Sequence, residues 1–157
     1  MIKLLRIDHR LLHGQVAVNW TASVGADCIL IANDGVMGDE LRKTTLRLAA
    51  PHGVKVVIKN VADSIQSINS GVTDKYKLMI VVETVADAAK LTAGCGSVKS
   101  VNLGNVKKRD GTQKFGNSQV YCTPEELQLI RGMIDSGVEV ELRQLPNHAK
   151  VLAQKLL

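Results

Sequence analysis

Short apolar runs alternate with amphipathic segments along most of the 157-residue chain. Runs such as Cys28-Ile-Leu-Ile-Ala32 are continuously apolar over the length of a strand, which is typical of parallel strands buried on both faces. The segments between them repeat apolar residues at helical spacing and end near a glycine or at Pro51. The pattern predicts strands at residues 2–7, 28–32, 54–58, 78–82, 98–103 and 138–142. It predicts helices at residues 15–24, 39–50, 61–69, 85–91 and 124–135.

The last third of the chain departs from this alternation. Asp110-Gly111 is a turn signal, and it predicts a short hairpin whose second arm ends at Val120-Tyr121. Thr123-Pro124-Glu125-Glu126 then has the residues of a capping box, which predicts the start of the last helix. Together the elements predict one α/β domain over residues 1–157. We expect a doubly wound, mostly parallel open sheet of about six to seven strands, with helices on both faces and a late antiparallel hairpin that makes the sheet mixed.

Charge and composition narrow the function classes. The net charge is +5, which suits either simple solubility or an acidic or phosphorylated partner. A basic cluster of Lys107, Lys108, Arg109 and Lys114 adds to the second interpretation. Aromatic residues make up only 3% of the chain, so the stacking platforms of single-stranded nucleic-acid binding are missing and no nucleic-acid partner is expected.

Several kinds of site are excluded by spacing. Cys28, Cys95 and Cys122 form neither a zinc motif nor a redox pair, and the four histidines show no metal-ligand spacing with carboxylates. No glycine triplet and no Gly-Lys-Ser/Thr loop opens a helix, so neither a dinucleotide cofactor nor an NTPase is expected. We therefore expect no metal and no cofactor. No apolar run approaches the ~20 residues of a membrane span, and we expect a cytoplasmic protein.

The chemistry concentrates between the first strand and the first helix, in Arg6-Ile-Asp-His-Arg-Leu-Leu-His-Gly-Gln-Val16. Such a loop lies at the carboxyl ends of parallel strands, where ligands bind. The charges of Arg6 and Arg10 disfavour the imidazolium and keep the ring of His13 neutral, hence nucleophilic. The same guanidiniums would bind a phosphoryl group. These residues predict a histidine that carries phosphate.

Other residues complete the candidate site. Gly14 permits close backbone approach, and a helix that starts near Gln15 would direct free N–H groups at an anion. Asp8 either holds an arginine or fixes the tautomer of the imidazole, or it simply closes an ion pair with Arg10. Asn33 and Asp34 follow the second strand and form either a turn or a wall of the same site. His9 is the rival nucleophile, but it lacks the following glycine and helix start.

The motif Arg6-Ile-Asp8-x-Arg10-Leu-x-His13-Gly14-Gln15-Val16 resembles the active-site motif of the enzyme IIB components of the mannose/fructose/sorbose-type sugar phosphotransferase system. The resemblance continues through residues 32–51, through Val101-Asn-Leu-Gly-Asn105 and through residues 137–143, and it covers nearly the whole chain.

The resemblance implies a doubly wound α/β fold and a transferase role in sugar transport. Such proteins accept a phosphoryl group from a phosphohistidine of the IIA component on one histidine, at Nδ1, and pass it to a sugar at the membrane IIC/IID components. The matching histidine is His13, and the matching arginines are Arg6 and Arg10. The resemblance implies peripheral association with the membrane transporter. The sequence leaves open the sugar, a homodimer, and the alternative of a stand-alone phosphohistidine signalling or regulatory domain.

Overall fold

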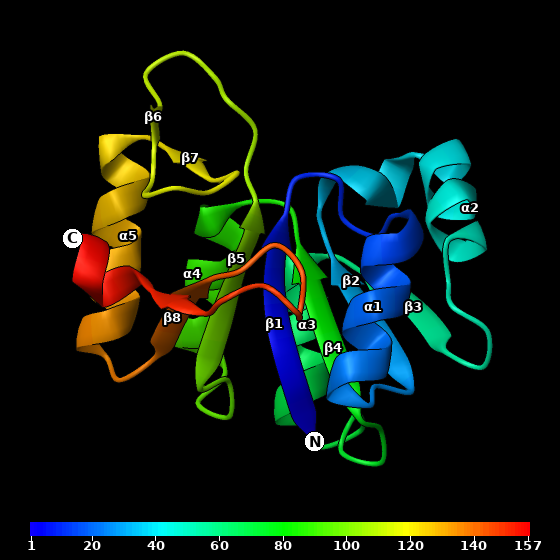
Figure 1. The fold of residues 1–157 in the computed structure, drawn as a ribbon. Coiled ribbons are helices and arrows are strands. Elements are labelled where there is room, and N and C mark those ends of the chain that lie inside the picture. The colour runs from blue at the N-terminus through cyan, green and yellow to red at the C-terminus, as the bar shows by residue number, and fades with distance from the viewer.

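The computed structural model describes all residues from 1 to 157, and its main feature is a seven-stranded sheet of order β3-β2-β4-β1-β5-β8-β9 (Figure 1). Six of these strands pair in parallel, whereas β9 pairs with β8 in the antiparallel sense. The strands are β1 (Ile2–Asp8), β2 (Cys28–Ala32), β3 (Lys55–Lys59), β4 (Leu78–Val82), β5 (Ser100–Asn105), β8 (Glu139–Leu142) and β9 (Val151–Leu152).

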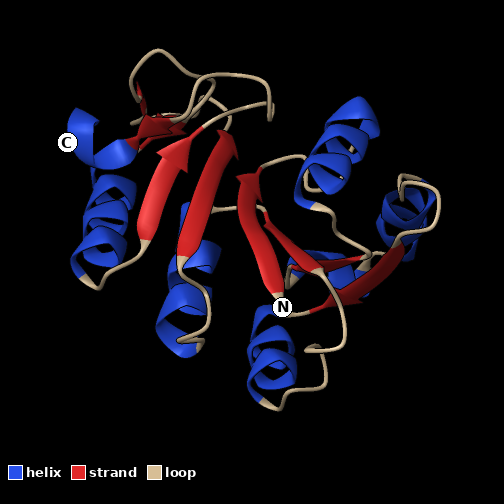
Figure 2. Cartoon of the chain, turned by 60° about the horizontal axis from the view of Figure 1, so that its bottom comes forward, coloured by secondary structure: helices blue, strands red, loops and turns tan.

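Helices cover both sides of the sheet (Figure 2). The α-helices are α1 (Gly14–Val24), α2 (Glu40–Leu48), α3 (Val61–Asn69), α4 (Val85–Gly94) and α5 (Pro124–Asp135), and the 3₁₀ helices are η1 (Gly35–Gly38) and η2 (Ala153–Leu156). Helices α1 and α2 lie on one face, and α3, α4 and α5 on the other. The predicted doubly wound α/β class is confirmed. None of the helices has both the length and the apolar character that crossing a membrane requires.

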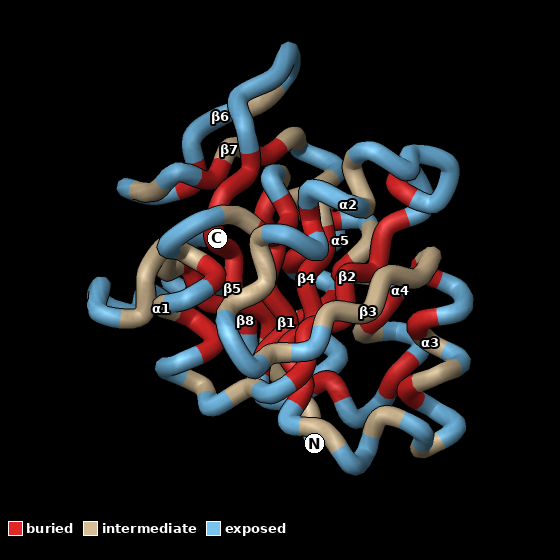
Figure 3. The backbone as a smooth tube through the Cα atoms, turned by 90° about the vertical axis from the view of Figure 1, so that its right-hand side faces the viewer, coloured by how far each residue is buried: buried red, intermediate tan, exposed pale blue.

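Two apolar cores follow from this layering. Residues such as Leu5, Ile80 and Val101 face α3, α4 and α5 in the larger core. The smaller core packs α1 and α2 against the opposite face and contains Trp20, which is 1% exposed. The strands form the buried centre of the molecule, while the chain around β6 (Gln113–Lys114) projects from it and is exposed (Figure 3).

The hairpin differs from the prediction. Strands β6 (Gln113–Lys114) and β7 (Tyr121–Cys122) form a separate two-stranded sheet instead of joining the main one. It is attached above the end of β5 through a single bridge between Val106 and Val120. The main sheet is mixed because of β9, a strand that was not predicted.

Local signals explain several element ends. Helix α5 begins with the predicted capping box: Glu126 N–H donates to Thr123 Oγ1 at 3.1 Å, and Thr123 N–H donates to Glu126 Oε1 at 2.9 Å. The three cysteines are free and buried, as expected of small apolar residues. Burial raises the pKa of the Cys122 thiol to about 12.

The order of the strands places a topological switch point at the carboxyl end of β1. This strand lies between β4 and β5 at the middle of the sheet. The chain leaves β1 toward α1 on one face, whereas it leaves β4 toward α4 on the other. Open α/β sheets bind ligands at such a reversal. The loop that contains His13 occupies this point.

Candidate functional site

His13 is the N-cap residue of α1, and one of its ring nitrogens is held by the protein. Its Nε2 lies 3.0 Å from Oδ2 of Asp8. Because an ionised carboxylate only accepts hydrogen bonds, Nε2 carries the proton. Nδ1 makes no hydrogen bond within the protein and is not among the buried unpaired atoms, so it reaches solvent. The geometry therefore presents Nδ1 with a free electron pair.

Asp8 is the centre of the site. Its Oδ2 accepts from Arg6 Nη2 at 3.1 Å and from Asn105 Nδ2 at 3.1 Å, in addition to His13. Its Oδ1 accepts from the backbone N–H of Arg10 at 3.0 Å. Burial by itself would raise the pKa of Asp8, but the charge of Arg6 and these hydrogen bonds outweigh it and hold the pKa below its usual range. The carboxylate thus stays ionised in a position that is 0% exposed.

A bulge in β5 brings Asn105 into this network. Ile7 pairs with Leu103 and Asp8 pairs with Asn105, so Gly104 is the extra residue between the two pairs. Such a bulge changes the direction of the next side chain. As a result the Asn105 amide reaches the same carboxylate oxygen as His13.

Arg6 is buried beneath Asp8 and is not exposed at the surface of the site. It is 1% exposed, and besides Asp8 it donates through Nη1 to Asn102 Oδ1 at 2.7 Å and to the Arg143 carbonyl at 3.3 Å. Burial lowers the pKa of Arg6, and the charge of Asp8 opposes that shift. The structure therefore gives Arg6 the position of a support for Asp8 and does not present it as an open phosphate contact.

Gly104 is required by this arrangement. A Cβ at position 104 would lie 2.2 Å from Cζ of Arg6. We expect Gly104→Ala to lower the free energy of unfolding by about 1–3 kcal/mol, since the ion-paired guanidinium cannot move aside without losing its partners. Gly132→Ala is the matched control, because a Cβ there meets nothing within 4 Å and the residue lies in α5. That control should be neutral or stabilising by up to about 1 kcal/mol in urea unfolding. Equal effects of the two variants would contradict the steric argument.

The start of α1 provides free N–H groups in front of His13. The first intrahelical bond runs from Ala17 N–H to the His13 carbonyl at 3.2 Å, so residues 14–16 have no backbone acceptor. Gly14 has φ +40°, a left-handed value that favours glycine, and the space at its absent Cβ is open. Gln15 is exposed, and its amide donates to Asn19 Oδ1 at 3.1 Å. Its backbone N–H, and not its side chain, is thus the group available to an anion.

Arg10 is the exposed cation of the loop. Its backbone is fixed by Asp8, while its guanidinium makes no ion pair. The hairpin projects at the same end of the molecule as this loop (Figure 1). Lys107, Lys108 and Lys114 are exposed on it, whereas Arg109 is paired with Glu126 at 2.7 Å.

Asn33 and Asp34 belong to a separate network. Asn33 donates to Glu83 Oε2 at 2.8 Å and accepts from Val36 N–H, and Asp34 accepts from Val61 N–H at 2.9 Å. These bonds connect the carboxyl ends of β2 and β4 to η1 and α3. Neither residue forms a hydrogen bond with the Asp8 network. The bonds agree with the turn interpretation, and a wall of the His13 site stays a prediction.

Some residues of the site were not recognised in the sequence. Asn102 and Asn105 follow the fifth predicted strand, a position that indicates either a turn or a wall of the same site, but no sequence pattern indicates their bonds to Arg6 and Asp8. The contacts of Trp20, Arg143 and Gln144 were not predicted. The alternation of β1 could have assigned Arg6 as the partner of Asp8, because residues two apart share a face of a strand. The rival His9 has its Nδ1 buried without a partner. No group of three potential metal ligands exists in the structure.

Comparison with known proteins gives one consistent family. The model of the sorbose subfamily IIB component of the phosphotransferase system (PTS) matches residues 2–157. A probable phosphotransferase enzyme IIB component of Streptococcus pyogenes is 31% identical over 162 residues, which cover 100% of this chain and 99% of that protein. The mannose-specific EIIAB component of Escherichia coli K12 is 31% identical over 157 residues, 100% of this chain and 48% of that protein.

A solved structure agrees with these relatives. The IIB domain of the sorbose permease of Klebsiella pneumoniae superposes with a TM-score of 0.90 at 29% identity. The superposition covers 96% of this chain and 92% of that chain.

Proposed function

The chain belongs to the sorbose subfamily of PTS IIB components, and from this premise we propose that it carries a phosphoryl group on His13 during sugar uptake. Membership gives it a role in sugar phosphotransfer. The finer steps are our proposal: His13 accepts the group from a phosphohistidine of a IIA component and passes it to a sugar at membrane IIC and IID components.

The observation that carries this proposal is the asymmetry of the His13 ring. Asp8 occupies Nε2 at 3.0 Å, which leaves the electron pair of Nδ1 at the surface. In the first step Nδ1 attacks phosphorus, the phosphorus–nitrogen bond of the donor breaks, and its electron pair returns to the donor histidine. In the second step a sugar hydroxyl attacks phosphorus and the bond between phosphorus and Nδ1 breaks. The electron pair of that bond returns to Nδ1, and the hydroxyl proton passes to a base at the membrane component or to water. Asp8 stabilises the positive charge that the His13 ring carries while it is phosphorylated.

The surroundings fit the charge of the transferring group. The backbone N–H groups of Gly14 and Gln15 lie at the positive end of α1 and form the candidate anion site. Arg10 is free to reach phosphoryl oxygens, while Arg6 acts through Asp8.

The partners follow from the family. The mannose-specific relative joins IIA and IIB in one chain, which supports a IIA component as donor. As a IIB component, the protein would act at the cytoplasmic side of a membrane transporter. The exposed lysines of the hairpin border the same end as His13 and suit a donor that carries a negative phosphohistidine.

Arg10→Ala should slow phosphorylation of the protein by about 10²-fold, which corresponds to about 2.7 kcal/mol of transition-state stabilisation. Its guanidinium makes no ion pair in the free protein, so the free energy of unfolding should change little. Arg10→Lys should restore the rate only in part, because one ammonium cannot bind two phosphoryl oxygens as a planar fork does. Rapid-quench measurement of transfer from a phosphorylated IIA component decides this. An unchanged rate in Arg10→Ala would assign the arginine no part in transfer.

The direct test is phosphorylation in vitro with labelled phosphoenolpyruvate, the general phosphotransferase proteins and a IIA component. We expect an acid-labile, base-stable label on the protein, and its discharge when membranes with IIC and IID components and their sugar are added. A protein that takes up no label, or an acid-stable one, would rule out the phosphohistidine carrier.

A further inference from the structure

Residues 143–150, here called the strap, return the chain from β8 to β9 across the face of the sheet near β1 (Figure 1). Backbone carbonyls fix its first two residues. The Arg143 carbonyl accepts from Arg6 Nη1 at 3.3 Å and from Asn102 Nδ2 at 3.0 Å. The Gln144 carbonyl accepts from Trp20 Nε1 at 2.9 Å. The start of the strap is thereby tied to β1, β5 and α1.

Trp20 reinforces this connection. Its ring centroid lies 5.4 Å from Cζ of Arg6 and 5.2 Å from Cζ of Arg143, so the ring packs against two cations. Arg143 in turn donates to Glu141 Oε1 at 3.0 Å, which balances the charge of the cluster. Because Trp20 is part of the helix that begins directly after His13, the strap and His13 are held to the same element.

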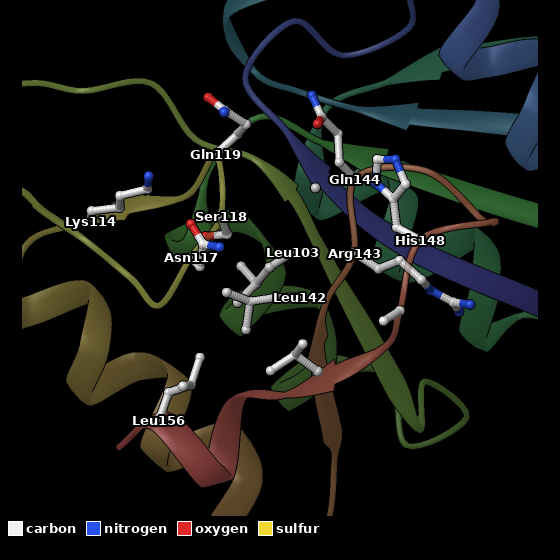
Figure 4. Close-up of a pocket in the computed structure, with 13 residues that line it drawn as sticks. Leu103, Lys114, Asn117, Ser118, Gln119, Leu142, Arg143, Gln144, His148 and Leu156 are labelled. Carbon is white, nitrogen blue, oxygen red and sulfur yellow. The ribbon is translucent and has the colours of Figure 1, made fainter.

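The side chain of Gln144 extends from this fixed backbone toward the site. A cavity of about 430 Å³ separates the strap from the hairpin, and Gln144 points away from its apolar floor of Leu103 and Leu142 (Figure 4). Gln144 Nε2 donates to Asn105 Oδ1 at 3.0 Å. Asn105 Nδ2 donates to the same Asp8 oxygen that accepts from His13 Nε2. Four residues thus form a chain of hydrogen bonds from the strap to the imidazole, in which Gln144 donates to Asn105, and Asn105 and His13 both donate to Asp8.

The orientation of the Asn105 amide depends on the hydrogen bond that Gln144 donates to it. The Asn105 amide could turn either its NH₂ or its oxygen toward Asp8, and only the NH₂ is compatible with a carboxylate. A donor on Oδ1 selects that orientation and polarises the amide, which strengthens its bond to Asp8. We propose, building on the role of His13 given above, that Gln144 is a positioning residue that keeps His13 in the Nε2–H tautomer, with Nδ1 ready to accept phosphate.

Two substitutions remove the donor in different ways. Gln144→Met keeps the approximate shape and offers no hydrogen bond, while Gln144→Glu places an acceptor against Asn105 Oδ1 and should rotate the amide. Gln128→Glu is the matched control for charge, because Gln128 lies on α5, away from the Asp8 network. We expect phosphorylation by a phosphorylated IIA component to slow about tenfold in Gln144→Met, the effect of one lost, partly buried hydrogen bond, and more in Gln144→Glu. The control should keep the wild-type rate.

The decisive readout is the ring of His13 itself. Nitrogen-15 NMR of the neutral ring should show a single Nε2–H tautomer in the wild type and a mixture of tautomers in both Gln144 variants. A single unchanged tautomer in both variants would overturn the proposal, even if transfer slowed, because the strap would then act on docking. If Gln144→Glu does not fold in a thermal melt, Gln144→Met decides alone. If the wild type accepts no phosphoryl group, the proposed function fails, and the NMR comparison still decides the positioning.

Discussion

Replacing His13 by glutamine should abolish phosphorylation of the protein, the largest effect expected of any single change. The nucleophile is the electron pair of Nδ1, and a carboxamide has no nitrogen that can take its place. The introduced glutamine would still find an acceptor at Asp8, and position 13 is partly exposed, so the variant should fold normally. The measurement is incorporation of label from phosphoenolpyruvate through a IIA component, with circular dichroism to check the fold.

His9→Gln is the matched control. His9 is four residues away in the same loop, but its Nδ1 is buried and unpaired, and the residue does not begin a helix. This variant should keep most of the wild-type labelling. If His13→Gln takes up label and His9→Gln does not, the phosphorylated residue is His9, and the proposal for His13 is wrong.

The central part of the fold could be predicted because its signals are local. Strands β2 and β4 and helix α3 have the predicted bounds. The two strands are uninterrupted apolar runs, and α3 begins at Asn60, whose side chain accepts from Asp63 N–H at 2.7 Å. Strand β9 could not be predicted, because two residues carry no periodicity. The position of the strap could not be predicted either, because the strap is held mostly through backbone carbonyls, and no pattern of side chains indicates these bonds.

The sequence predicted which residues form the candidate site better than it predicted what each of them does there. A loop with Arg6, Asp8, Arg10 and His13 indicated an anion site, and two of the alternatives for Asp8 are found: it pairs with an arginine and it holds the imidazole. The partner is Arg6 and not Arg10, because strand alternation directs Arg6 and Asp8 to one face while Arg10 lies beyond the strand. The bulge at Gly104, which brings Asn105 to Asp8, depends on strand register and has no signature in the order of residues.

Asp8→Asn should have the largest effect on stability, with a loss of about 3–5 kcal/mol in the free energy of unfolding at neutral pH. The Asp8 side chain is fully buried, and three side-chain donors point at one of its oxygens. An asparagine would leave the charge of Arg6 buried without its ion-pair partner. In the orientation that keeps the bond from Arg10 N–H, it would also turn its own NH₂ toward the donors of Arg6, His13 and Asn105. Urea unfolding measures the loss, and Asp110→Asn, at an exposed position, is the control.

The loss in the free energy of unfolding caused by Asp8→Asn should also depend on pH in a defined direction. Burial acts to raise the pKa of Asp8, but the charge of Arg6 and the hydrogen bonds lower it below its usual value. A carboxyl with a depressed pKa in the folded state contributes its full stabilisation above its unfolded pKa of about 3.9, and this contribution is lost as the pH falls through the folded pKa. The difference in stability between wild type and Asp8→Asn should therefore be constant from pH 7 to about pH 5 and shrink below about pH 4. A difference that stays constant down to about pH 2.5 would show that shape, and not the ionised carboxylate, accounts for the loss.

Since the same carboxylate holds Nε2 of His13, Asp8→Asn should also lose the single tautomer of the ring and accept phosphate about 10²-fold more slowly or worse at neutral pH.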